Sequence, residues 1–319
     1  MKTDVIALGE LLIDFTMNGA SEQGNSLFEA NPGGAPCNVL AMLQKLGKNT
    51  KFIGKVGDDQ FGKLLRQTIE DVGIDSTYLL NDSQIPTTLA FVHKLPDGDR
   101  DFSFYRKPGA DLMLREGDIE ETMFDDASIF HFGTLSMTDD EVTKATMRAV
   151  EIAKNKGMII SLDPNLRPPL WSSLELAREQ MLKAISLCDV LKISDNEIQF
   201  VSGLEDYDEG VRFLKEKFGT KLICLTLGKD GSRAYYGDLK VEVNGFEQPN
   251  VIDTTGAGDT FCGCVLSYIL EHGLDSLTHD MLREMLTFAN AAASLVTTKR
   301  GAIKSMPEVD EVRTLISGN

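Results

Sequence analysis

The stretch Asp-Thr-Thr-Gly-Ala-Gly-Asp-Thr-Phe, residues 253–261, runs directly into residues 260–270, whose apolar side chains repeat at a spacing of four. This spacing predicts an amphipathic helix. Because Gly256, Ala257 and Gly258 have small side chains or none, their N–H groups can turn toward one point at the positive end of the helix dipole. The stretch therefore predicts a pocket for an oxyanion or a transferring phosphoryl group.

Asp259 falls in the first turn of this expected helix. A helix N-terminus favours the charged form of a carboxyl group, so Asp259 is expected to be ionised. Beside an anion pocket, such a carboxylate can accept the proton of an attacking hydroxyl group. The alternative is an acidic residue that only stabilises the start of a helix.

Two better-known phosphate motifs do not fit the sequence. A dinucleotide fingerprint at residues 256–261 fails because Phe261 stands at the third glycine position. A Walker A loop at residues 57–64 fails because Leu64 cannot bind Mg²⁺ and because two aspartates in the loop would repel phosphate.

Short apolar runs alternate with segments of helical period along the chain. The expected strands are residues 5–8, 51–56, 128–132, 158–162, 190–193 and 222–225, and the expected helices are residues 35–46, 141–154, 260–270 and 281–296. The alternation predicts an α/β fold with a doubly wound, mostly parallel sheet flanked by helices.

Two stretches depart from this alternation. Residues 11–15 follow the first strand without a helix between them, and residues 87–105 predict two strands around a polar turn at 96–99. We expect a small antiparallel β-sheet inserted into a single domain of residues 1–319. Its segments, approximately 11–31 and 86–110, would form a lid over a site or a dimer contact.

The apolar outer positions Leu89, Phe91 and Phe102 leave both lid roles open, because they can pair across a homodimer or cover the chain's own site.

Composition excludes several classes of protein. The 319 residues are 42% hydrophobic, and 32 Lys and Arg stand against 49 Asp and Glu, for a net charge of −17. Such a chain is not expected to bind nucleic acid or an acidic membrane surface. Its partners are expected to be small molecules.

The cysteines do not indicate a disulfide framework. Cys37, Cys188, Cys224, Cys262 and Cys264 are scattered and odd in number, as expected for buried, reduced thiols. The first ten residues lack the apolar core of a signal peptide, and no apolar run approaches about 18 residues. We expect a soluble, cytoplasmic protein.

Residues 31–38 read Asn-Pro-Gly-Gly-Ala-Pro-Cys-Asn and lead into the first expected helix. Gly33 and Gly34 permit close approach of a ligand to the backbone, and Asn38 offers both a donor and an acceptor to a polyol. Asp14 lies among apolar neighbours, where a carboxylate needs hydrogen-bond partners such as two sugar hydroxyl groups. The alternative for 31–38 is an ordinary helix N-terminal turn.

Together these motifs resemble the ribokinase-like (PfkB) carbohydrate kinase family over essentially the whole chain. The resemblance is carried by Gly-Glu-Leu-Leu-Ile-Asp-Phe at 9–15, Gly-Gly-x-x-x-Asn at 33–38 and the stretch at 253–261. Within the family, Asp-Pro-Asn-Leu-Arg at 163–167 and Tyr-Arg-Lys-Pro-Gly-Ala-Asp at 105–111 are most similar to the fructokinases.

The resemblance implies an ATP-dependent kinase that phosphorylates the 6-hydroxyl group of D-fructose. It assigns general-base catalysis to Asp259 and the anion hole to the amides of Gly256, Ala257 and Gly258. The implied sugar-binding residues are Asp14, Gly33, Gly34, Asn38, Asp259 and, from the lid, Arg106.

The same resemblance implies a nucleotide site, formed by Arg167, Lys192, Ser194, Thr226, Gly228, Gly231, Gly256, Gly258 and Asn290. Ser194 stands where the family usually has Asn, which is a departure. Glu197 would order the Mg²⁺ that accompanies ATP through water. A K⁺ ion is implied beside the anion hole, at Asp253, Thr255, Gly301 and Ser305.

Other functions remain open at this point. The same motifs suit a 2-keto-3-deoxygluconate kinase, a ribokinase or a nucleoside kinase. A sugar-binding sensor that has lost phosphoryl transfer is an alternative of another class, although the intact 256–259 segment argues against it. A nicotinamide oxidoreductase is disfavoured by the missing third glycine.

Overall fold

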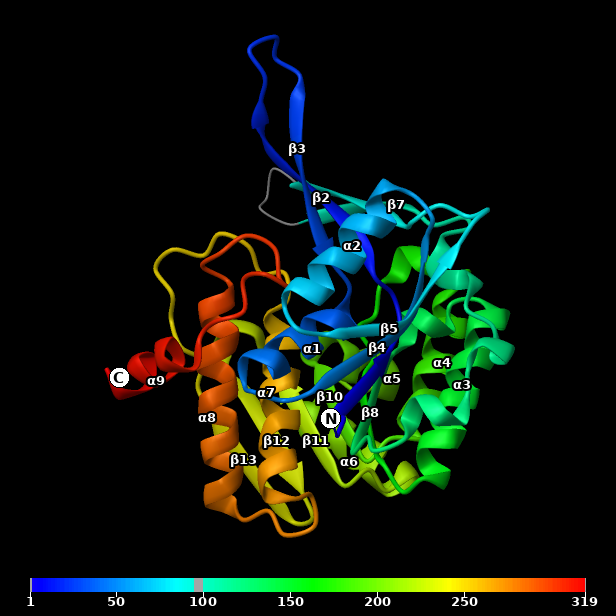
Figure 1. Cartoon of the computed structure of the whole chain (residues 1–319). Helices are drawn as coiled ribbons and strands as arrows, with labels where there is room; N and C mark the ends of the chain where they lie inside the picture. Colours follow the sequence, from blue (N-terminus) through cyan, green and yellow to red (C-terminus); the bar gives the residue numbers. More distant parts are fainter. Residues whose placement is uncertain (1, 95–99, 319) are drawn as a thin grey trace.

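A large sheet of nine strands organises the computed structural model, which describes residues 2–94 and 100–318 (Figure 1). Seven neighbouring strands are parallel, and the two at one edge are antiparallel. The order is β13 (Leu239–Val243), β12 (Ser232–Tyr236), β11 (Leu222–Thr226), β10 (Val190–Ser194), β9 (Ile159–Asp163), β8 (Ile129–Gly133), β1 (Val5–Leu8), β4 (Thr50–Gly57) and β5 (Asp75–Asp82). The predicted mostly parallel sheet is confirmed.

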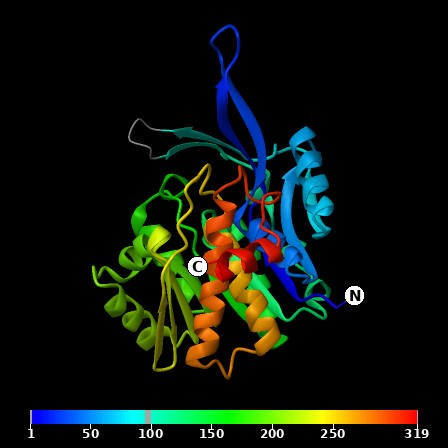
Figure 2. The same cartoon turned by 90° about the vertical axis from the view of Figure 1, so that its left-hand side faces the viewer.

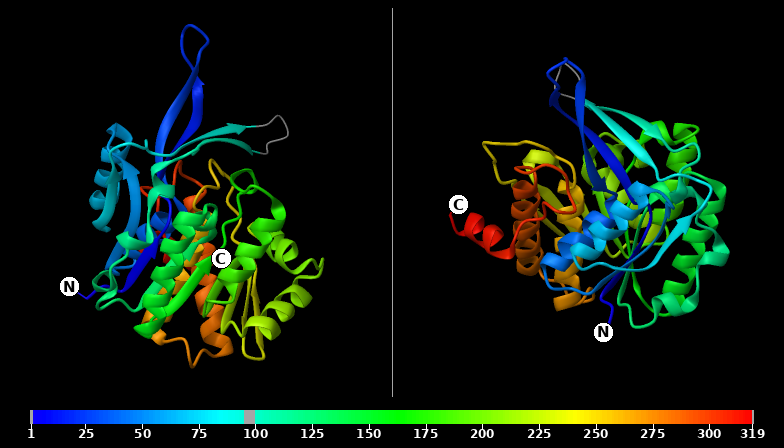
Figure 3. Two further views of the ribbon diagram at one scale, coloured as in Figure 1. Left: turned by 90° about the vertical axis from the view of Figure 1, so that its right-hand side faces the viewer. Right: turned by 45° about the horizontal axis from the view of Figure 1, so that its top comes forward.

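Helices cover both faces of this sheet, and each face has its own hydrophobic cluster (Figure 3). One face carries α1 (Ala35–Lys45), α2 (Gln60–Asp71), α7 (Ala257–His272), α8 (His279–Val296) and α9 (Val309–Ser317). The other carries α3 (Asp140–Asn155), α4 (Leu174–Ile185), α5 (Asp195–Ser202) and α6 (Tyr207–Phe218). No helix in the described part of the chain is long and apolar enough to cross a membrane.

A small four-stranded sheet lies beyond the edge where the parallel strands end (Figures 1 and 2). Its order is β3 (Ser26–Gly33), β2 (Leu12–Ala20), β6 (Leu89–Lys94) and β7 (Arg100–Tyr105). Its β2–β3 and β6–β7 pairs are antiparallel, while the central β2–β6 pair is parallel. The expected turn at 96–99 lies outside the described residues.

Strand β3 was not expected, because the glycines and prolines around it predict a turn. Its partner β2 extends past the expected end at residue 15 to Ala20, and the two form a hairpin that projects from the molecule (Figure 2). Phe91 stacks on Phe15 at 4.8 Å and meets Phe28 edge-on. Phe91 is therefore partly covered within this chain.

Helix α7 begins three residues earlier than its apolar period predicts. Its N-cap is Gly256, with φ of 81°, so Ala257 and Gly258 belong to the first helical turn rather than to the loop before it. A Cβ atom at Gly256 would lie 2.5 Å from Cβ of Ala302. Both the left-handed backbone and the close approach require glycine there.

The rejected Walker-like segment, residues 57–64, is the turn from β4 into α2. Asp59 caps α2 by accepting a 2.8 Å hydrogen bond from the amide of Gly62. It also accepts 2.8 Å hydrogen bonds from the amide and hydroxyl of Thr87, which fastens the base of the small sheet to the main sheet. All five cysteines are buried and free of disulfides, as predicted.

Candidate active site

Helices α1 and α7 bring two predicted site residues together at the ends of the parallel strands. Nδ2 of Asn38 donates a 2.8 Å hydrogen bond to Oδ2 of Asp259, and both side chains are at least nine-tenths buried. Oδ1 of Asn38 is also buried and accepts no hydrogen bond from any described residue. A buried acceptor without a donor indicates a place for a ligand hydroxyl group.

Burial raises the pKa of the Asp259 carboxyl group above its ordinary value. The hydrogen bond from Asn38 and the positive charges of Lys192 and Arg167 act in the opposite direction. The sequence predicted a carboxylate whose charged form is favoured by the helix dipole. Desolvation outweighs that effect and moves the pKa toward the working range of a general base.

Close contacts explain why glycine is required at two of the predicted sugar-binding positions. A Cβ at Gly33 would lie 2.6 Å from Oδ2 of Asp14, so the carboxylate rests directly on the glycine backbone. A Cβ at Gly34, where φ is 138°, would lie 2.4 Å from the carbonyl oxygen of Glu10. Asp14 is held opposite Asn31 by the β2–β3 register. Asp14, Gly33 and Gly34 therefore lie at the junction of the small sheet and α1.

A buried lysine stands at the first turn of α7. Nζ of Lys192 lies 3.0 Å from Oδ2 of Asp163, and a Cβ at Gly258 would lie 2.8 Å from the same Nζ. Burial raises the pKa of Asp163 to about 6, although Lys192 favours its charged form. The neighbouring carboxylates raise the pKa of Lys192, although burial opposes this. The ammonium group therefore stays charged beside the predicted anion hole.

One of the three amides predicted for the anion hole is engaged within the protein. The N–H of Ala257 points back into the preceding turn, toward the carbonyl of Thr254 at 3.4 Å. The N–H groups of Gly258 and Asp259 come too early in the helix to meet a carbonyl within it. Together with the amide of Gly256, the N-cap, these two amides are the donors that the turn leaves for an anion.

A cavity of about 790 Å³ opens beside this turn. Seven predicted nucleotide-binding residues line it: Lys192, Ser194, Thr226, Gly228, Gly231, Gly258 and Asn290. Arg167 and Gly256 do not line it, although the charge of Arg167 acts on Asp259. Residues 245–249 and Val251, which carry no recognisable motif, also line the cavity and were missed by the sequence analysis.

Two predicted ligand contacts are engaged within the protein. The side-chain amide of Asn290 donates to the carbonyls of Val243 and Asn244 and accepts from Ser232, so it holds the ends of β12 and β13. Glu197 forms a capping box with Ser194 and also accepts a 2.7 Å hydrogen bond from the amide of Leu166. Ser194 thus serves as a helix cap.

Burial opposes ionisation of Glu197, but Lys192 and the hydrogen bonds from Ser194 and Leu166 outweigh it and lower the pKa. Glu197 is therefore a buried carboxylate. With three hydrogen bonds already accepted, it suits contact with a metal-bound water better than direct binding of a metal.

The residues predicted to surround K⁺ lie in two adjoining loops. Asp253 accepts hydrogen bonds from the amide and hydroxyl of Thr255 and from the amide of Gly301. The hydroxyl of Ser305 donates to the carbonyl of Arg300. Because these donors occupy the carboxylate, backbone carbonyls would have to supply most ligands of a cation. The described residues contain no group of three or more His, Cys, Asp or Glu side chains suited to a metal.

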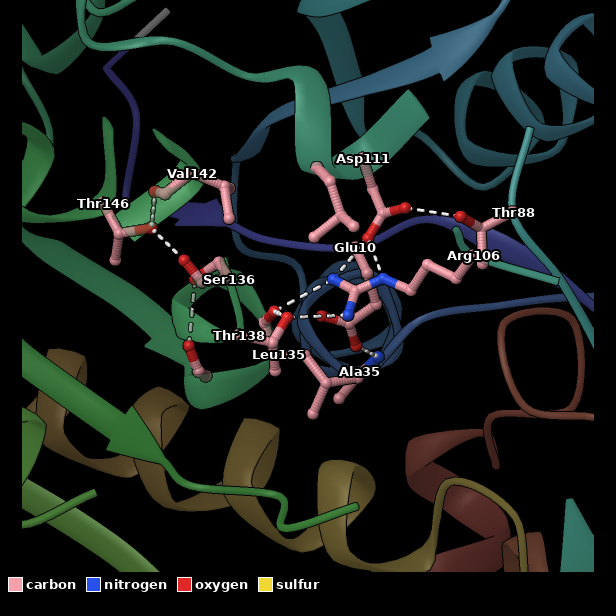
Figure 4. Close-up of polar contacts among 12 residues, drawn as sticks. Glu10, Ala35, Thr88, Arg106, Asp111, Leu135, Ser136, Thr138, Val142 and Thr146 are labelled. Atoms are coloured by element: carbon pink, nitrogen blue, oxygen red, sulfur yellow. Dashed lines mark hydrogen bonds and ion pairs between the residues drawn. The ribbon is translucent and has the colours of Figure 1, made fainter. Parts of the chain in front are cut away.

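Arg106 differs most from its predicted role as a sugar contact. It follows β7, is 5% exposed, and donates to Asp111, Thr138 and the carbonyl of Leu135 (Figure 4). All three guanidinium nitrogens are engaged by protein atoms. In this conformation Arg106 fastens the base of the small sheet to the main domain.

Comparison with known proteins places these features in one family. The model of the pfkB family of carbohydrate kinases matches residues 2–309. Fructokinase-1 of Zea mays is 40% identical over 314 residues, which cover 98% of this chain and 97% of that protein. A fructokinase of Xylella fastidiosa, solved with bound ATP, superposes with a TM-score of 0.90 at 31% identity and covers 100% of this chain and 99% of its own.

A double-mutant fructokinase of Vibrio cholerae O395, solved with fructose, ADP and a potassium ion, is also similar. It has a TM-score of 0.88 and 28% identity, and the match covers 99% of each chain.

Proposed function

The chain belongs to the pfkB family of carbohydrate kinases, and from this premise we propose that it transfers the γ-phosphoryl group of ATP to the 6-hydroxyl group of D-fructose. The observation that carries the proposal is the Asn38–Asp259 hydrogen bond. This bond involves a buried carboxylate in the first turn of α7, directly after Gly258, which lines the nucleotide-sized cavity. The similarity to the maize fructokinase supports fructose as the acceptor.

In this reaction, Asp259 accepts the proton of the 6-hydroxyl group. The sugar oxygen then bonds to the γ-phosphorus as the bond from that phosphorus to the bridging oxygen of ADP breaks. An alcohol is a weak acid, so positioning and charge stabilisation contribute more than strong base catalysis. The buried acceptor of Asn38 suits a second sugar hydroxyl and would hold the sugar in place.

Charge on the transferring group is stabilised by the amides of Gly256, Gly258 and Asp259 and by Lys192. Removal of one such oxyanion donor typically lowers kcat by roughly 10²–10³-fold. Asp163 holds the Lys192 ammonium at 3.0 Å, so the cation is in place before substrate binds.

With MgATP as the substrate, the metal would neutralise phosphate charge, and Glu197 would accept a hydrogen bond from a water bound to that metal. The ATP-bound Xylella fructokinase supports the nucleotide assignment. We extend the proposal to K⁺ at the Asp253–Thr255 turn and the Gly301–Ser305 loop. Its support is the potassium ion of the Vibrio fructokinase and the 3.2 Å hydrogen bond from the amide of Gly301 to Asp253, which joins the two loops.

The small sheet of β2, β3, β6 and β7 is proposed as a lid that closes on the sugar. A kinase site open to water would hydrolyse ATP, so closure should depend on sugar. ATP hydrolysis without sugar is therefore expected to be far slower than phosphoryl transfer to fructose. Rapid hydrolysis by the sugar-free protein would contradict a closing lid.

A coupled ADP-release assay over several acceptors tests the proposed function. Fructose, 2-keto-3-deoxygluconate, ribose and a nucleoside are compared at matched concentrations, and the product is identified by nuclear magnetic resonance. We expect the highest kcat/KM with fructose and a phosphate on O6. A higher value with another acceptor would reassign the substrate, and no turnover with any sugar would support a binding protein instead.

A further inference from the structure

Arg106 is the centre of a buried hydrogen-bond network at the base of the lid (Figure 4). Its Nε and Nη2 lie 2.7 and 2.6 Å from Oδ2 of Asp111. Nη1 donates to Thr138 at 2.8 Å, and Nη2 also donates to the carbonyl of Leu135 at 2.9 Å. Thr88, directly before β6, donates to the other oxygen of Asp111. The network therefore ties the two ends of the β6–β7 hairpin to the segment after β8.

Glu10 belongs to a different segment, the short link from β1 into β2. Its Oε1 accepts a 2.8 Å hydrogen bond from the amide of Ala35, the first residue of α1. Its carboxyl group also interacts electrostatically with Arg106 and Asp111. Glu10 is only 3% exposed, so these interactions are weakly screened by water.

Helix α1 connects Glu10 to the proposed chemistry. The helix starts at the amide that Glu10 binds and, one turn later, carries Asn38. Asn38 in turn donates to Asp259. Hydrogen bonds thus run from Glu10 through the first turn of α1 to the proposed catalytic carboxylate, and Glu10 also lies within electrostatic reach of Arg106 at the base of the lid.

We propose that Glu10 is a positioning residue that couples the Arg106–Asp111 pair at the base of the lid to the N-terminus of α1. The proposal rests on the sugar kinase function proposed above. It adds an account of how the position of the lid and the position of the sugar-binding loop depend on each other. Glu10 does not touch the reacting atoms. It acts through Ala35 and thereby through Gly33, Gly34 and Asn38.

The coupling depends on the charge of Glu10. Burial raises its pKa to about 7, against the lowering effects of the Ala35 hydrogen bond and Arg106. The charged or titratable groups that face it are Arg106, Asp111 and Cys37, and burial raises the pKa of the Cys37 thiol well above its usual range. Glu10 is therefore ionised above neutral pH, where it attracts Arg106, and is neutral below it.

The first test compares Glu10→Gln with Glu22→Gln, a matched change in the exposed part of the lid. Glutamine keeps an oxygen that accepts the hydrogen bond from the Ala35 amide, but it removes the negative charge that attracts Arg106. We expect Glu10→Gln to raise KM for fructose by about 5-fold or more at pH 8 and to leave KM for ATP unchanged. In the wild type, KM for fructose should rise between pH 8 and pH 6, and in Glu10→Gln it should not.

Equal effects on both KM values, or the same pH dependence in wild type and Glu10→Gln, would overturn the proposal. Glu22→Gln should match the wild type throughout. If the wild type phosphorylates no sugar, the proposed function fails, and the coupling is then judged by the second measurement alone.

Hydrogen–deuterium exchange is that second measurement, because it needs no activity. Glu10→Gln and Asp111→Asn are each compared with the wild type at pH 8. We expect both variants to exchange at least about 5-fold faster at residues 33–38 and at 105–111, and at wild-type rates in α8. Using both variants guards against one failing to fold. Faster exchange only next to the substituted residue, or equally throughout the chain, would overturn the coupling.

Discussion

Nδ2 of Asn38 donates a 2.8 Å hydrogen bond to Oδ2 of Asp259, and so joins two residues 221 positions apart at the meeting point of α1 and α7. This bond connects the loop proposed to bind sugar to the proposed catalytic base. It also leaves Oδ1 of Asn38 as a buried acceptor without a donor among the described residues.

Asp259→Asn tests whether Asp259 acts as the general base. Asparagine keeps the shape of the side chain but cannot accept the proton, so kcat should fall more than about 100-fold. ATP affinity, measured by calorimetry, should stay close to the wild type. Since the folded-state pKa of Asp259 is raised, its ionisation costs stability as the pH rises, and at pH 7 the variant should melt no lower than the wild type. Near-normal turnover would contradict the assignment.

Asn38→Asp tests the contact between Asn38 and Asp259 through the pH dependence of kcat. A second carboxylate beside Asp259 disfavours its charged form, so the acid limb of the kcat–pH profile should move to higher pH. The control is Asn155→Asp, the same substitution at the exposed end of α3. An acid limb that stays in place in Asn38→Asp would show that the profile does not report on Asp259.

Asp14→Ala should weaken sugar binding selectively. Each lost hydrogen bond to a charged group is worth about 1.5–3 kcal/mol, so KM for fructose should rise at least about tenfold while KM for ATP is unchanged. Asp238→Ala, in the exposed turn between β12 and β13, is the control. A rise in KM for ATP alone would mean that the two ends of the site are reversed.

Gly258→Ala tests the position of Lys192. The added Cβ would lie 2.8 Å from Nζ of Lys192 and would push the ammonium away from the α7 turn. We expect kcat to fall about tenfold or more, although alanine is favoured over glycine in a helix by up to about 1 kcal/mol. Gly117→Ala, where a Cβ meets open space, should leave activity unchanged. Unchanged turnover in Gly258→Ala would remove Lys192 from the mechanism.

The buried strands were predictable because both of their faces are apolar, and β1, β4, β8, β9, β10 and β11 lie within two residues of their expected bounds. Strands β12 and β13 were not predicted. In each of them apolar residues alternate with charged or polar ones, such as Arg233 and Glu242, near the edge of the sheet. Strand β3 was hidden by residues that usually mark turns.

The site was predictable where backbone geometry demands a residue type. Gly33, Gly34 and Gly256 each approach another group too closely for a side chain, and this constraint is visible in the sequence. The engagement of Arg106 and Glu197 was not predictable, because their partners come from segments that only the tertiary fold brings together. Glu10 carries no local signal for the same reason: its partner Ala35 is 25 positions away.

A crystal structure of the wild-type protein with fructose and a non-hydrolysable ATP analogue tests the central claim most directly. The account predicts that O6 of fructose lies about 2.6–3.2 Å from a carboxylate oxygen of Asp259 and faces the γ-phosphorus at the first turn of α7. A sugar bound with O6 directed away from Asp259, or a γ-phosphate remote from Gly258, would contradict it.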